Sequence, residues 1–159
     1  MSGLIDAEVA AAIDAAVLAW LATADADGAP NVSPKEVFAA LDRDRVVIAH
    51  IASPRSVRNA RANARGCLAL VDVFRQRGCK LTGGLRVVDV GDEGFDELAA
   101  PLRALAGDAF TVRAVFELTV ESVAPIVAPS YVFRADEVTE ASMVADAMRT
   151  YGVRPLGRP

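Results

Sequence analysis

CLALVDVFRQRGCKLTGGLRVV, residues 67–88, is the segment that most strongly indicates a β-sheet protein. The apolar runs Cys67–Val73 and Cys79–Val90 flank a charged turn, Arg75–Gly78, as in two strands joined by a turn. Gly83 and Gly84 interrupt the second run. Paired glycines inside a strand indicate a bulge, or a place where another backbone or a ligand comes close. The segment therefore predicts two neighbouring strands, the second of them irregular.

The segments on either side continue this pattern of short strands separated by turns and helices. Apolar runs bounded by turn residues predict strands at Val17–Ala24, 30–38, 46–50, Cys67–Val73, Cys79–Val90 and 112–123. Apolar periodicity and capping residues predict helices at Ile5–Ala16, from Ser53 to about Ala64, from about Phe95 to Leu105, and at Ala141–Tyr151. Six short strands with helices at the connections predict a closed or partly closed antiparallel barrel.

The length and composition suit one globular domain. A chain of 159 residues with 53% hydrophobic residues can bury a core without disulfides or a structural metal. We expect a single domain over residues 1–159, with a core over about 17–123 and a C-terminal arm and helix over about 124–159. No run approaches the length of a membrane span, and the first 16 residues are acidic where a signal peptide would be basic. We therefore expect a cytoplasmic protein without a membrane segment.

The few cysteine and histidine residues argue against a disulfide or a metal site. Cys67 and Cys79 lie on neighbouring predicted strands without CxxC spacing, and His50 is the only histidine. We expect no metal, and we expect His50 to be structural.

Basic residues are concentrated in the middle of the chain. Between Lys35 and Arg86 there are 11 basic and 4 acidic residues, whereas the rest of the chain holds 6 basic and 17 acidic residues. A nucleic-acid-binding domain is usually basic as a whole. The uneven charge favours a small anion bound at one place over a nucleic acid.

The segment Ser53–Asn59, SPRSVRN, is the strongest candidate for that anion site. Ser53 followed by Pro54 is typical of a helix start, where free backbone N–H groups and the positive end of the helix dipole bind phosphate. Arg55, Ser56, Arg58 and Asn59 add side-chain donors within the first two turns. The alternative is a solvated amphipathic helix whose arginines only face water.

Two further segments carry polar side chains on strands. In Val32-Ser33-Pro34-Lys35 the proline removes one ladder donor, and Ser33 and Lys35 share a strand face from which they could reach a ligand. The alternative is an edge strand protected from aggregation by its proline and lysine. In Lys80-Leu81-Thr82 the lysine and threonine share a face just before the paired glycines, against which a flat ring could lie.

Together these segments resemble the pyridoxamine-phosphate-oxidase-like, FMN-binding split-barrel family. The resemblance runs from about Leu18 to Val120, through LATADADGAPNVSPKEVF, DRVVIAH, SPRSVRNARAN, CLALVDV and GCKLTGGLRVV. It implies a mainly β fold, a six-stranded antiparallel split β-barrel with flanking helices, and a homodimer with FMN at the interface. It also implies that Arg55, Ser56 and Asn59 bind the phosphate and ribityl end, that Val32, Ser33, Pro34 and Lys35 line the ring, and that Lys80, Leu81 and Thr82 contact the phosphate or the ring edge.

The resemblance implies an FMN-dependent oxidoreductase whose substrate and electron donor are open. The chain lacks the family's basic C-terminal substrate signature, because Arg154 and Arg158 lie in a tail rich in glycine and proline; oxidation of pyridoxamine phosphate is not expected. One alternative is a flavin carrier or sensor, whose bound FMN would not be reduced by NADH or NADPH. Another is a haem protein with His50 as axial ligand.

Overall fold

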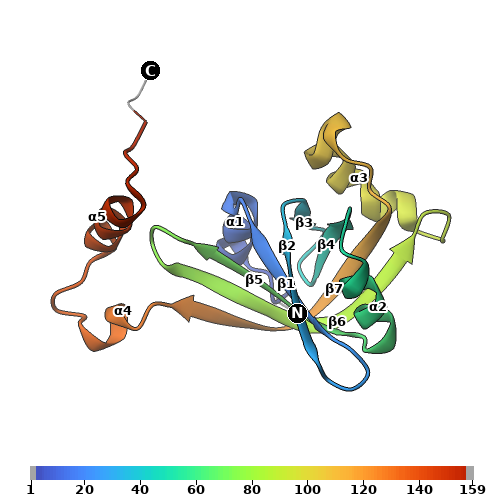
Figure 1. Cartoon of the computed structure of the whole chain (residues 1–159), viewed down its shortest axis with the longest axis horizontal. Helices are drawn as coiled ribbons and strands as arrows, with labels where there is room; N and C mark the ends of the chain where they lie inside the picture. Colours follow the sequence, from blue (N-terminus) through green and yellow to red (C-terminus); the bar gives the residue numbers. More distant parts are fainter. Residues whose placement is uncertain (1–2, 157–159) are drawn as a thin grey trace.

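The computed structural model describes residues 3–156 and contains one curled antiparallel sheet with helices on both faces (Figure 1). The sheet has seven strands in the order β2-β1-β5-β6-β7-β4-β3. The strands are β1 (Ala19–Ala24), β2 (Pro30–Lys35), β3 (Phe38–Ala40), β4 (Arg45–His50), β5 (Arg65–Asp72), β6 (Arg77–Asp89) and β7 (Ala114–Val127). The helices are α1 (Ala7–Ala15), α2 (Pro54–Ala62), α3 (Phe95–Ala106), the 3-10 turn η1 (Gly107–Ala109), α4 (Ser130–Phe133) and α5 (Glu140–Tyr151).

The predicted mainly β fold with flanking helices is confirmed, but the strand count is seven rather than six. The strand predicted over 30–38 is divided after Lys35 into β2, which pairs with β1, and β3, which pairs with β4. These two pieces form the two edges of the sheet. The chain bends between them, so that the carbonyl of Val37 accepts a hydrogen bond from the amide of Ala49. Because of the bend, one continuous segment supplies both edge strands of the curled sheet.

Two apolar clusters lie on opposite faces of the sheet. The inner cluster fills the concave face beneath α1 and α2 and includes Leu21, Leu68 and Phe116. The outer cluster lies between the sheet and α3 and includes Val47 and Leu102. Strand β4 belongs to both clusters, which is why its sequence is an uninterrupted apolar run instead of an alternating one. We call the face of the first cluster the inner face, and the opposite one the outer face.

Strand β6 carries the irregularity that its paired glycines predict. The register between β6 and β7 shifts between Thr82 and Gly83, which is a β-bulge. Strand β7 runs to Val127, beyond the predicted end at residue 123, and it leads into an arm that holds α4 and α5 at the opposite end of the sheet from α3 (Figure 1). No helix in the described part of the chain has the length and apolar character needed to cross a membrane.

Candidate functional site

The start of α2 makes polar contacts with strand β2 and with the end of β4. Ser53 is the N-cap and Pro54 occupies the first turn, as the sequence predicts, but the Ser53 side chain does not cap the helix. Its Oγ instead accepts a hydrogen bond from Lys35 Nζ at 2.5 Å and lies 3.3 Å from His50 Nδ1. The first N–H groups of the helix have no intrahelical partner. The helix start therefore joins a lysine from β2 and a histidine from the end of β4.

Strand β2 directs alternate side chains toward this helix start. Asn31, Ser33 and Lys35 lie on its inner face, so the predicted shared face of Ser33 and Lys35 is confirmed. Ser33 Oγ lies 2.9 Å from Ser56 Oγ, and Asn31 Nδ2 donates to the same oxygen at 3.2 Å. Because Ser56 is fully buried, these contacts fasten α2 to the edge of the sheet.

Asn59 completes this arrangement one turn further along α2. Its Nδ2 donates to Thr23 Oγ1 on β1 at 3.2 Å, and both residues are buried. The hydroxyl of Ser56 and the amide of Asn59 therefore point into the protein, whereas Arg55 lies on the exposed side of the helix. The three residues predicted to serve one phosphate do not converge in this structure.

Lys35 is a buried cation without an anionic partner. Only 5% of the residue is exposed, and its ammonium group lies 5.2 Å from the centre of the Phe116 ring. Among residues 3–156 no carboxylate forms an ion pair with it. Burial lowers the pKa of Lys35 from 10.5 to about 8. A charge in this position is costly unless an anion from outside approaches it.

His50 is held in its neutral form beside that lysine. Burial lowers the pKa of His50 below its ordinary value, and the positive charges of Lys35 and Arg113 lower it further. The ring packs edge-on against Phe116, with its centre 5.9 Å from that of the phenyl ring. At neutral pH the imidazole can therefore accept a hydrogen bond or bind a metal centre through a ring nitrogen.

The arginines of α2 and its surroundings divide into paired and unpaired groups. Arg61 forms an ion pair with Asp89, and Arg65, just after the helix, pairs with Glu121 at 2.6 Å. Arg55 and Arg58, in the first two turns, form no ion pair within the described part of the chain. The unneutralised positive charge is therefore concentrated at the start of the helix, where the dipole is also positive.

The remaining predicted site residues lie elsewhere on the sheet. Val32 and Pro34 are exposed on the outer face, and Lys80 and Thr82 lie on that face three strands away from β2. Leu81 is fully buried in the inner cluster. The ten predicted residues thus divide between the two faces of the sheet.

Sequence reasoning missed three members of the site: Thr23, Asn31 and Ser53 as a partner of lysine. Asn31 could have been found, because it lies two residues before Ser33 and therefore on the same strand face. Thr23 and the role of the Ser53 hydroxyl depend on contacts between residues 18 to 36 positions apart, which no local pattern reveals. In the described residues, no group of three His, Cys, Asp or Glu side chains could hold a metal ion.

Several solved structures share this fold. HupZ of Group A Streptococcus is 25% identical, with a TM-score of 0.64, and the match covers 75% of this chain and 91% of that chain. An FMN-binding protein of Syntrophomonas wolfei is 16% identical, with a TM-score of 0.63 over 74% of this chain and 82% of that one. The haem storage protein HutZ of Vibrio cholerae is 17% identical, with a TM-score of 0.61 over 77% of this chain and 94% of that one.

The family comparison covers the part of the chain that builds the sheet and the start of α2. No curated protein matches the chain. The family model described as pyridoxamine 5'-phosphate oxidase matches residues 5–126, more than three quarters of the sequence. The chain therefore belongs to the pyridoxamine 5'-phosphate oxidase family.

Proposed function

We propose that this protein binds FMN through the start of α2 and acts as an oxidoreductase. The observation that carries the proposal is Lys35, a buried cation beside a helix start, with no carboxylate partner in the described chain. The charged part of the ligand would supply the missing anion. Arg55 and Arg58, which form no ion pair within residues 3–156, add two cations on the exposed side of the same helix. A neighbour with the same fold is an FMN-binding protein, which supports the choice of ligand.

The donor set fits a phosphate-bearing cofactor better than a neutral one. Backbone N–H groups at a helix start and guanidinium groups are the donors that bind phosphate, and the described residues offer both at α2. FMN, when bound, supplies the electron-transfer chemistry, while the protein binds and orients it. Val32 and Pro34 on the edge strand β2 are proposed contacts of the ring, whereas Lys80 and Thr82 on β6, three strands away on the outer face, could contact it only from a second copy of the chain.

We further propose that the protein is a homodimer that buries its outer sheet face. Trp20, Val32 and Val71 are large apolar residues exposed on strands β1, β2 and β5, in the part of the outer face that α3 leaves uncovered. An exposed apolar surface of this kind on a soluble protein is typical of an interaction site. A two-fold axis would pair the same surface of both copies.

Replacing Arg55 by alanine tests the phosphate site. We expect Arg55→Ala to weaken FMN binding roughly tenfold or more, because a charge-assisted hydrogen bond of about 1.5–3 kcal/mol is removed. Riboflavin, which has the same ring without a phosphate, should lose much less affinity. Fluorescence titration of the apoprotein with both compounds measures the difference.

Arg61→Ala is the matched control on the same helix. Arg61 is exposed and paired with Asp89, so its replacement should change FMN affinity and stability little. If FMN and riboflavin weaken equally in Arg55→Ala, or if Arg61→Ala has the same effect, the start of α2 is not the phosphate site. A protein that takes up no FMN at all would contradict the proposal as a whole.

His50 makes haem binding the second candidate function. Its low pKa leaves the imidazole neutral, and one relative with this fold is a haem storage protein. If haem is the ligand, haem titration should produce a Soret band that is lost in His50→Ala and kept in Ser53→Ala, which leaves the imidazole in place. Equal spectra for wild type and His50→Ala would exclude His50 as the axial ligand.

A further inference from the structure

Residues 128–156, which we call the arm, follow β7 and lie outside the part of the chain that matches the family. Their described polar and aromatic contacts with the sheet go to the tip of the β5–β6 hairpin. The Tyr131 hydroxyl donates to the carbonyl of Arg75 at 2.8 Å, and Arg75 pairs with Glu140 at 2.9 Å. Arg77 lies over the Tyr131 ring at 4.1 Å. No described arm residue belongs to either apolar cluster. The arm is thus anchored to the hairpin tip and away from the core.

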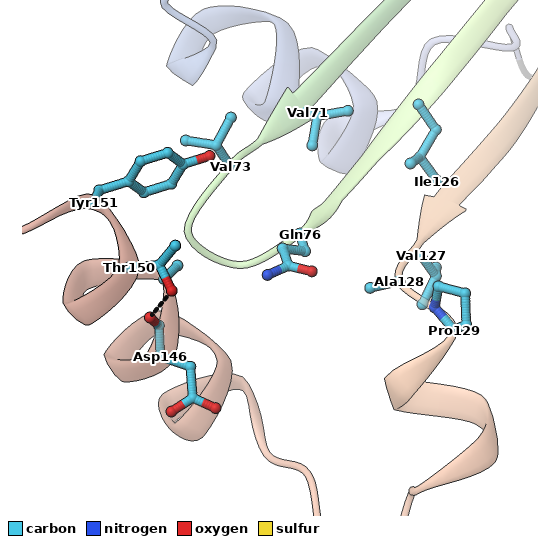
Figure 2. Close-up of a pocket in the computed structure, with 11 residues that line it drawn as sticks. Val71, Val73, Gln76, Ile126, Val127, Ala128, Pro129, Asp146, Thr150 and Tyr151 are labelled. Atoms are coloured by element: carbon cyan, nitrogen blue, oxygen red, sulfur yellow. Dashed lines mark hydrogen bonds between the residues drawn. The ribbon is translucent and has the colours of Figure 1, made fainter.

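A groove of about 490 Å³ lies between the arm and the end of the sheet. Figure 2 shows α5 on one side of it, the β5–β6 hairpin behind it and the end of β7 on the other side. Its walls are largely apolar and include Val71, Val73, Ile126, Val127, Pro129 and Tyr151. Val71 on β5 and Ile126 on β7 both lie on the outer face, where they are the register partners of Gly78 on the strand between them. The groove therefore continues the apolar outer face on which Trp20 and Val32 are exposed.

The short helix α4 beside this groove carries two apolar side chains without cover. Phe133 is 84% exposed and Val132 is 66% exposed. Helix α4 begins immediately after Pro129, which lines the groove. Because Phe133 is almost fully exposed, it does not fill the groove of its own chain. The arm thus holds an open apolar groove and an uncovered aromatic side chain next to each other.

We infer that a second copy of this chain fills the groove, with Val132 and Phe133 of each arm entering the groove of the other copy. Under a two-fold axis both grooves are filled at once, because each arm carries Val132 and Phe133 and also forms one wall of a groove. The groove is continuous with the outer sheet face, so one interface would include both surfaces. This inference rests on the homodimer proposed above and adds the arm to its interface.

The charges of the arm disfavour a membrane as the occupant. Asp136, Glu137 and Glu140 follow α4 closely, and Arg134 is paired with Glu137 at 2.8 Å. Anionic lipid surfaces attract clusters of basic residues, which this segment does not provide. Aromatic side chains that are exposed in one copy and buried in a pocket of the partner are typical of the central contacts of an interface.

The test is a disulfide between two different full-length variants. Val73→Cys and Phe133→Cys are each made with Cys67→Ser, which removes the half-buried thiol; the other thiol, Cys79, is buried, and burial raises its pKa. The two proteins are mixed under reducing conditions until their subunits exchange, and are then oxidised. We expect a covalent dimer on a non-reducing gel, because disulfides form only between cysteines with Cβ atoms about 4 Å apart. The amount of this dimer should be about tenfold or more higher in the mixture than in either variant oxidised alone.

Leu105→Cys, an exposed position on α3, replaces Phe133→Cys in the control mixture and should give no covalent dimer. Light scattering on the wild-type protein separates the two proposals. A dimer in solution without the mixed disulfide overturns the arm exchange and leaves the sheet interface standing, whereas a monomer overturns both. Binding to phosphatidylglycerol vesicles that is lost in Phe133→Asp would assign the groove to a membrane and also overturn the inference.

Discussion

Lys35→Met is expected to make the apoprotein more stable at neutral pH while it weakens FMN binding. The ammonium group of Lys35 is buried against Ser53 and Phe116 without a carboxylate, and burial lowers its pKa from 10.5 to about 8. Each tenfold change in proton affinity corresponds to about 1.4 kcal/mol, so keeping this charge in the fold costs on the order of 3 kcal/mol. Methionine is similar in length and carries no charge, so the substitution removes this cost. The loss of the hydrogen bond to Ser53 offsets about 1 kcal/mol of the gain in stability. The net gain should be about 2 kcal/mol.

The gain should depend on pH in a defined direction. Between about pH 8 and pH 10.5 the unfolded state holds the Lys35 proton more tightly than the folded state, so the wild-type protein becomes more stable as pH rises through this window. The advantage of Lys35→Met should be complete below about pH 8 and should disappear by about pH 10.5. Urea denaturation of both proteins at pH 7, 9 and 10.5 measures it.

Arg61→Met is the control, because Arg61 is exposed, pairs only with the exposed Asp89 among the described residues, and its replacement should change the free energy of unfolding by about 0.5 kcal/mol or less. An advantage of Lys35→Met that stays constant from pH 7 to pH 10.5 would show that the stability difference does not arise from the lysine charge. Unchanged FMN affinity in Lys35→Met would remove Lys35 from the proposed binding site.

Gly83→Ala should be strongly destabilising. A Cβ at this position would overlap the carbonyl oxygen of Thr119 in the neighbouring strand β7. Because the obstacle is backbone, β6 and β7 would have to separate at the bulge. Overpacking of this kind costs about 3 kcal/mol or more. At roughly 2–4 °C per kcal/mol for a chain of this size, the melting temperature should fall by about 6–12 °C in a thermal scan.

Gly84→Ala is a close control because it changes the adjacent residue of the same strand. The nearest atom to its added Cβ is Glu121 Oε1 at 3.7 Å, an ordinary van der Waals contact. Both substitutions reduce the flexibility of the unfolded chain equally, so this effect cancels when the two variants are compared. The remaining difference is the overlap with the Thr119 carbonyl, which only Gly83→Ala introduces. Similar melting temperatures for the two variants would mean that β6 and β7 do not approach each other as closely at Gly83 as this structure shows.

Local sequence patterns were sufficient for most individual elements. Ser53 and Pro54 mark the start of α2, Gly83 marks the bulge in β6, and a period of two places Ser33 and Lys35 on one face. These features depend on residues that are adjacent or a few positions apart. Their backbone preferences operate whatever the rest of the chain does.

The pairing partners of β2 and β3 and the length of β7 were not predicted. Pro34 indicates an edge, a bulge or an interruption in the strand predicted over 30–38, but it does not indicate which strands the two halves pair with. The two halves pair with β1 and β4, at opposite edges of the sheet, and that choice follows from the closure of the sheet and not from the segment itself.

The sequence by itself determined the family, the mainly β fold and the concentration of basic residues in the middle of the chain. Only the tertiary structure decided which of those basic residues are neutralised. Arg61 and Arg65 form ion pairs with Asp89 and Glu121, which are 28 and 56 positions away, whereas Lys35, within residues 3–156, contacts a hydroxyl and an aromatic ring and pairs with no carboxylate. The physical reason is that burial and charge pairing depend on neighbours brought together by long-range strand pairing, and no local pattern encodes them.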